Sequence, residues 1–180
     1  MLIEIILGVI VFIASILLII LIYKNKFNLY IVKIDEAENN VDILLQKKVD
    51  LLNKIAPIVN KFLKSDDFLC DLKVLCIKNY SHFELYDILR GNYNDLFNIL
   101  DDNEKLYKKK DLNELLDELN NNEENLIAAI KFYNNNVVNH NGLIDKFPSN
   151  IIRLIFGYKK YDFYKNEKRE IFEILKEEKN

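Results

Sequence analysis

The sequence predicts an all-α protein in which a single N-terminal transmembrane helix is followed by an antiparallel helical bundle with long helices. Three observations predict this class. The residues that break helices are scarce, with four glycines and two prolines among 180 residues. An uncharged apolar run opens the chain. After it, apolar residues recur at alternating three- and four-residue spacing, as in helical bundles.

The apolar run extends from Ile5 to Tyr23. As a helix it would span about 29 Å, close to the thickness of a bilayer's hydrocarbon core. A cleaved signal peptide is the alternative, but it needs a basic start and a small-residue cleavage site. Here Glu4 precedes the run, and no small-x-small site follows it. We therefore expect an uncleaved anchor over residues 1–23.

The residues that flank the run predict its orientation. Lys24, Lys26 and Lys33 follow it, and no basic residue precedes it. Because positive flanks remain in the cytoplasm, we expect a single-pass protein of the cell membrane. Its N-terminus would lie outside and its C-terminal domain in the cytoplasm. Tyr23 can lie at the lipid headgroups, so the lipid bilayer is the first expected partner.

The remaining chain divides into a predicted bundle over residues 24–158 and a charged tail over 159–180. The seam of the first bundle helix has the spacing of a coiled coil or bundle. We expect Pro57 to kink this helix near Asn53. The seam consists of Ile34, Ala37, Val41, Leu44, Leu51, Ile55, Ile58 and Phe62.

A second helical region is predicted from Ser65 or Asp66, either of which can cap it, to Leu100. Cys70 and Cys76 fall in this region. On one helix their Cα atoms would lie about 9 Å apart, too far for a disulfide. We interpret them as buried free thiols, which suit a reducing compartment.

A third helix is predicted over about residues 112–146, with Asp111 as its N-cap and Glu114 completing a capping box. Pro148 ends this helix, because proline disfavours helical geometry in the residue before it. Pro148 can itself be the first residue of a short helix that Gly157 stops.

Two asparagines lie on the apolar seam of the third helix. A buried amide needs a polar partner, and leaving it unpaired costs about 1–3 kcal/mol. Asn134 and Asn141 would therefore select one arrangement of the bundle. The alternative is that the seam is rotated and both amides touch water. The predicted seam consists of Ile127, Ile130, Asn134, Val137, Asn141 and Ile144.

Two charged residues also fall on seams. Lys48 lies on the first seam, and Glu123 lies one heptad before Ile130 on the third. If these helices pack antiparallel, a Lys48–Glu123 pair could form inside the bundle. Each charge would need such a partner, because lone buried charges are costly.

Three stretches resemble the LemA family: residues 41–51 ("VDILLQKKVDL"), 123–150 ("EENLIAAIKFYNNNVVNHNGLIDKFPSN") and 156–158 ("FGY"). The chain departs from that pattern where lysines replace the basic Arg–Arg pair, at Lys47 and its neighbour, and where His140 replaces a Tyr. The resemblance implies a single anchor and a cytoplasmic antiparallel bundle. The family's activity is unassigned, so the resemblance supplies no catalytic residues.

We identify no catalytic, cofactor-binding or metal-binding residues in the sequence. His82 and His140 are far apart and lie outside any metal-ligand spacing, so each is expected to be solvated or hydrogen-bonded. Residues 107–110 ("YKKK") could touch anionic lipid heads, or form a solvated turn. A net charge of −3 argues against nucleic acid as a partner.

These observations favour a non-enzymatic bacterial membrane protein that acts as a scaffold or regulator through an unidentified protein partner. Two alternatives stay open. The chain could be a structural protein that self-associates into homo-oligomers, or an enzyme with a site inside the bundle.

Overall fold

The computed structural model describes residues 1–64 and 80–164 of the 180-residue chain. It contains the α-helices α1 (Leu2–Leu63), α3 (His82–Asp102), α4 (Lys110–Asp145) and α5 (Ser149–Phe156), and the 3-10 helix η1 (Leu106–Lys108). The described ranges contain no strand, so the all-α prediction is confirmed. The expected cap at Ser65 or Asp66, both cysteines and most of the charged tail lie outside the described residues.

Helix α1 joins the apolar run and the first seam without interruption. By length and composition, α1 is the one described helix that could cross a membrane, and its apolar N-terminal part is exposed. Its seam is buried at Ile34, Val41 and Ile55, among other positions. Pro57 lies inside the helix, which continues to Leu63, so this proline does not end it.

The structure forms two compact units, and α1 and α4 contribute residues to both. The first unit combines Met1–Ala37 with the chain from Phe132 onward, and the second is Glu38–Lys131. These units differ from the expected division at residues 23 and 158, which stays a prediction.

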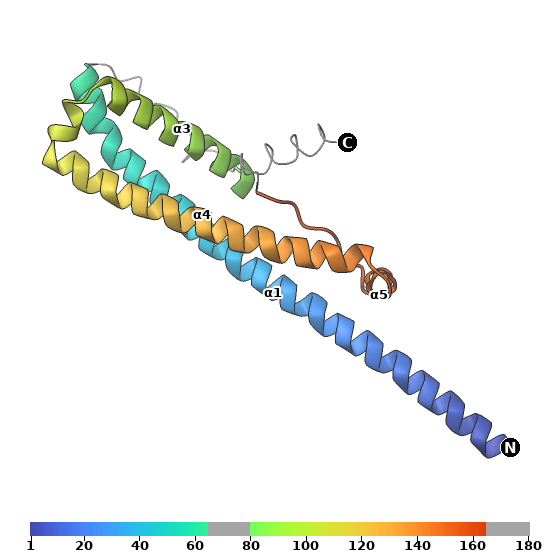
Figure 1. Cartoon of the computed structure of the whole chain (residues 1–180). Helices are drawn as coiled ribbons and strands as arrows, with labels where there is room; N and C mark the ends of the chain where they lie inside the picture. The colour runs from blue at the N-terminus through green and yellow to red at the C-terminus, as the bar shows by residue number, and fades with distance from the viewer. Residues whose placement is uncertain (65–79, 165–180) are drawn as a thin grey trace, which may run out of the picture. The chain divides into compact units, whose positions relative to one another are not determined.

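In the second unit, α3 lies beside the later part of α1 and the first part of α4 (Figure 1). His82 of α3 contacts Asp42 of α1, and Tyr93 further along α3 lies over Lys48. The residue numbers of the contacting positions increase along both helices, so α3 runs parallel to α1. Helix α4 runs antiparallel to α1, because Lys109 meets Phe62 and Glu123 meets Lys48.

Helix α3 begins with a capping box that the sequence interpretation missed. The Glu84 backbone N–H donates to the Ser81 hydroxyl, and the Ser81 N–H donates to the Glu84 carboxylate. These bonds satisfy N–H groups that the first helical turn leaves unpaired. The bond from the Ser81 N–H, followed by one from the Ser81 hydroxyl, lowers the pKa of the Glu84 carboxyl group. Gly91 lies in the middle of α3, which continues past it to Asp102.

The predicted cap of the third helix is wrong by two residues. Helix α4 begins at Lys110, and Asp111 lies inside its first turn, where its charge favours the helix N-terminus. The seam of α4 is also rotated at its start. Leu126 is buried, whereas Ile127 is 51% exposed, because adjacent apolar residues leave the phase of the seam ambiguous.

The core of the first unit is formed by Phe27 of α1, Ile144 of α4 and Ile152 of α5. Helix α5 begins after Pro148, which is its N-cap and not its first residue. It ends at Gly157, which adopts the left-handed conformation (φ 72°) that glycine tolerates best.

Candidate functional site

Lys48 and Glu123 meet inside the second unit. The Lys48 Nζ atom lies 2.5 Å from Glu123 Oε2. The Lys48 side chain is 0% exposed, and that of Glu123 is 14% exposed. Tyr93 of α3 presents its ring 4.8 Å from the ammonium. The pair therefore links α1 to α4 beneath an aromatic ring that also attracts the cation.

Burial and the counter-charge act on Lys48 in opposite directions. Loss of solvation lowers the pKa of Lys48, and the carboxylate of Glu123 partly offsets this effect. Burial, followed by the charges of Glu123 and Glu124, raises the pKa of Tyr93. A lysine with a lowered pKa can be a nucleophile, but a fully buried amine cannot meet a substrate. The geometry therefore gives the pair a structural role.

Two further amides hold the second unit together, and the sequence interpretation missed both. Asn122 Nδ2 donates to the Leu44 carbonyl oxygen of α1 at 3.0 Å. The Tyr93 hydroxyl donates to Asn120 Oδ1 at 2.8 Å, which joins α3 to α4. The run of three asparagines at residues 120–122, inside a predicted helix, was the available signal.

Asn134 and Asn141 bind the main chain of residues 158–164, which we call the 158–164 segment. Asn134 Nδ2 donates to the Tyr164 carbonyl, and the Tyr164 N–H donates back to Asn134 Oδ1, both at 3.0 Å. Asn141 makes the same two bonds with Tyr161, at 2.9 and 3.0 Å. Each asparagine amide therefore satisfies both backbone groups of one residue.

The spacing of the two amides matches that of an extended chain. Seven helical residues advance about 10.5 Å, and three extended residues span about 10 Å. The 158–164 segment follows α5 as extended, non-helical chain (Figure 1). Asn134 is buried and Asn141 is half-buried. The amides thus find partners in non-helical main chain, where the sequence interpretation expected either another helix or water.

His140 lies between the two amide positions and is fully buried. Its ring meets Phe27 and Tyr161 edge-on, with ring centroids 5.4 and 5.0 Å away. Nδ1 lies 3.4 Å from Asn141 Oδ1, and buried Nε2 has no hydrogen-bond partner among the described residues. Burial lowers the pKa of His140, so the imidazole is neutral near pH 7. Of the two expected states of this histidine, solvated or hydrogen-bonded, the structure shows the second, through Nδ1.

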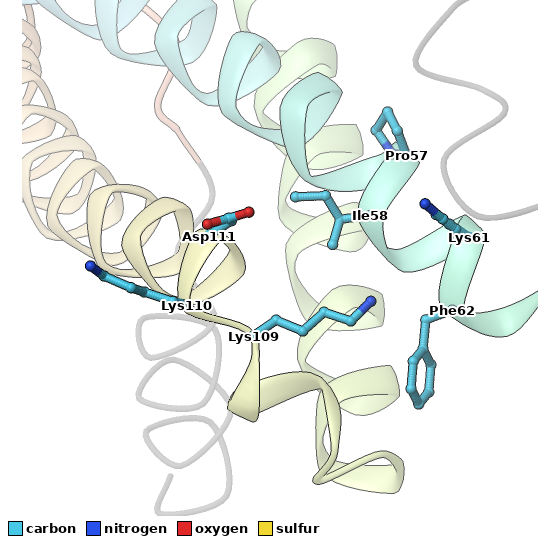
Figure 2. A pocket seen from close by; sticks show the side chains of 7 residues that line it. All are labelled: Pro57, Ile58, Lys61, Phe62, Lys109, Lys110 and Asp111. Carbon is cyan, nitrogen blue, oxygen red and sulfur yellow. The ribbon is translucent and has the colours of Figure 1, made fainter.

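Helices α1 and α4 border an open pocket of about 730 Å³ in the second unit. Figure 2 shows the side chains of Lys61, Lys109, Lys110 and Asp111 around it. Lys109 lies over the Phe62 ring, 5.3 Å from its centroid. The Lys110 side chain extends away from the other labelled side chains and lies 3.9 Å from Glu114, so Lys61 and Lys109 are the cations that could attract a small anion electrostatically. Of the predicted lysine-rich stretch, Lys109 and Lys110 line this pocket.

The predicted membrane flanks make aromatic contacts in the first unit. Lys26 lies 5.2 Å from the centroid of the Tyr23 ring. Lys24 lies 5.1 Å from the Phe156 ring, which belongs to α5. The contact of Lys24 with Phe156 places α5 beside the end of the apolar run.

Acidic and histidine side chains meet at one exposed position of the second unit. His82 contacts Asp42 and lies 3.9 Å from Glu38. Among residues 1–64 and 80–164, no group of three or more His, Cys, Asp or Glu residues has the arrangement to hold a metal ion. The hydrogen bond of His82 with Asp42 therefore links α3 to α1.

The chain was compared with models of known protein families. The model of the LemA family matches residues 76–174, which is more than half of the chain. No curated protein matches the chain. The matched region includes the two amides and the short helix α5. The chain therefore belongs to the LemA family.

Proposed function

We propose that the chain is a membrane-anchored, non-enzymatic binding protein, a scaffold or regulator at the cytoplasmic face of the cell membrane. The exposed apolar part of α1 supports the anchor. The lysines at 24, 26 and 33, all on its C-terminal side, support the orientation. Membership of the LemA family agrees with an anchored helical protein.

The observation that supports binding most is the pair of amides on α4. Asn134 and Asn141 hydrogen-bond the backbone of another segment at matched spacing. Such bonds recognise an extended chain whatever its side chains, as in strand-addition complexes. The 158–164 segment would then occupy a surface that an extended segment of a partner protein uses in turn.

A peptide experiment tests this surface directly. A shortened chain that ends at Gly157 is purified in detergent, and a fluorescent peptide of residues 157–164 is added. Anisotropy should show saturable binding that the Asn134→Ala, Asn141→Ala double variant weakens about tenfold or more, since four hydrogen bonds are lost. Asn139→Ala, an exposed asparagine of the same helix, is the matched control. Circular dichroism checks that each variant is folded.

The partner itself is sought by crosslinking in membranes. The shortened chain should capture the same protein in each repeat, and more of it than the full chain captures. The reason is that the Asn134 and Asn141 amides of the shortened chain are not occupied by the 158–164 segment. Equal capture by the Asn134→Ala, Asn141→Ala variant would contradict the proposed surface. Repeated failure to capture any protein above the control would contradict a binding function. Self-association stays a prediction, and size measurement in detergent tests it.

A further inference from the structure

We propose that α5 lies in the lipid–water interface, with Ile151, Leu154 and Ile155 turned toward the acyl chains. This inference rests on the proposed membrane anchor and goes beyond it. It assigns a second lipid contact to the chain and fixes the depth of the first unit at the bilayer surface.

The outward side of α5 is apolar, whereas a helix surrounded by water presents polar residues outward. Ile151, Leu154 and Ile155 lie at positions i, i+3 and i+4, so they share one face. They are 49, 76 and 60% exposed. Ile152, on another side of the helix, is buried. Helix α5 thus has one apolar face that the protein covers and a second that it leaves open.

The position of α5 along α1 identifies what covers the open face. Ile152 belongs to a buried cluster with Phe27, and Ile20 and Tyr23 of α1 pack against that cluster. Ile20 and Tyr23 form the last turn of the apolar run. A bilayer crossed by this run has its headgroup boundary at that turn. The open face of α5 therefore continues the apolar surface of the anchor.

The residues around α5 suit an interface between lipid and water. Phe147, two residues before the helix, is exposed, so a further large apolar side chain near α5 is left uncovered by the protein. Arg153 of α5 and Lys146 before it are exposed cations that can reach phosphate groups. Lys24 lies over the Phe156 ring, which places an additional cation beside the helix. Apolar and basic side chains in this arrangement are typical of interfacial helices.

The full chain, reconstituted in vesicles of phosphatidylcholine and phosphatidylglycerol, tests this placement by spin labelling. Cys70 and Cys76 are first replaced by serine, and one cysteine is then introduced as Leu154→Cys. Nitroxide collisions with oxygen, which concentrates in lipid, are compared with collisions with a nickel complex, which stays in water. Ile13→Cys in the apolar run and exposed Asn139→Cys on α4 are the reference sites. These label positions are exposed, so the substitutions leave the core intact.

We expect the oxygen-to-nickel ratio at Leu154 to be about threefold or more above that at Asn139, since interfacial helices bury one face about 5–10 Å deep. A label at Arg153→Cys, on a different side of α5, should give a lower ratio than Leu154. A Leu154 ratio equal to that of Asn139 overturns the inference. Protection of Leu154 from both reagents also overturns it, in favour of a covering protein surface. A low oxygen-to-nickel ratio at Ile13 would contradict the membrane anchor itself. A low ratio at Leu154 together with a high ratio at Ile13 would contradict only the placement of α5.

Discussion

Replacing Glu123 by glutamine would leave the Lys48 ammonium buried without its counter-charge. Lys48 Nζ and Glu123 Oε2 lie 2.5 Å apart, and the Lys48 side chain is fully buried. Removing one partner of such a pair costs about 3–5 kcal/mol. Because Glu123 retains some access to water, we expect the lower end, about 3 kcal/mol. In a protein of this size that corresponds to a fall in melting temperature of about 6–12 °C.

Urea unfolding of the full chain in detergent, followed by circular dichroism, measures this loss. The double variant Lys48→Met, Glu123→Met removes both charges together and should be within about 1 kcal/mol of the original chain, since apolar replacement of a buried pair is often neutral. Lys47→Met is the matched control. It breaks a 3.0 Å pair with Glu118 whose members are both about half exposed, so it should cost under about 1 kcal/mol. The reasoning is refuted if Glu123→Gln costs no more than Lys47→Met, or if the double variant loses as much as the single one.

Three further predictions follow from the hydrogen bonds and titrating groups. Asn141→Ala should expose the Tyr161 amide to hydrogen exchange, because its acceptor is lost, whereas Asn139→Ala should leave its protection unchanged; equal effects would contradict the amide contact. Since burial lowers the pKa of His140 below 6.5, the unfolded chain binds a proton first as pH falls, and the stability present above pH 6.5 should decline below it. The melting temperature of His140→Phe should fall less than that of the original chain between pH 7.5 and 5; parallel curves would refute this assignment. Ser81→Ala removes the capping box of α3 and should cost about 1 kcal/mol in urea unfolding, and no loss would contradict the role of the cap.

Periodic features could be predicted from the sequence because each depends on local spacing. The apolar run and the first seam follow from helical periodicity alone, and both lie in α1. The seam positions of Lys48 and Glu123 predicted a pair, and these side chains lie at hydrogen-bond distance. The capping box of α3 was also readable, since Ser81 and Glu84 have the required spacing, but the expected helix start lay further upstream.

The binding of the 158–164 segment could not be predicted, because it joins residues 20 to 30 positions apart without a periodic signal. Asn134 and Asn141 were noticed for their place in a seam, yet their partners are backbone groups of Tyr164 and Tyr161. Backbone groups carry no sequence information, so any residues could have supplied them. The direction of α3 was equally hidden, because it depends on tertiary contacts such as that of His82 with α1.

The central claim is that the apolar start of α1 holds the remaining chain at the cytoplasmic side of a membrane. Protease treatment of right-side-out and inside-out membrane vesicles, with a tag after Asn180, tests it in one measurement. The account predicts that the tag is digested in inside-out vesicles alone, and that the chain stays with the membranes during an alkaline wash. Digestion of the tag in right-side-out vesicles, or release of the chain into the wash, would contradict it.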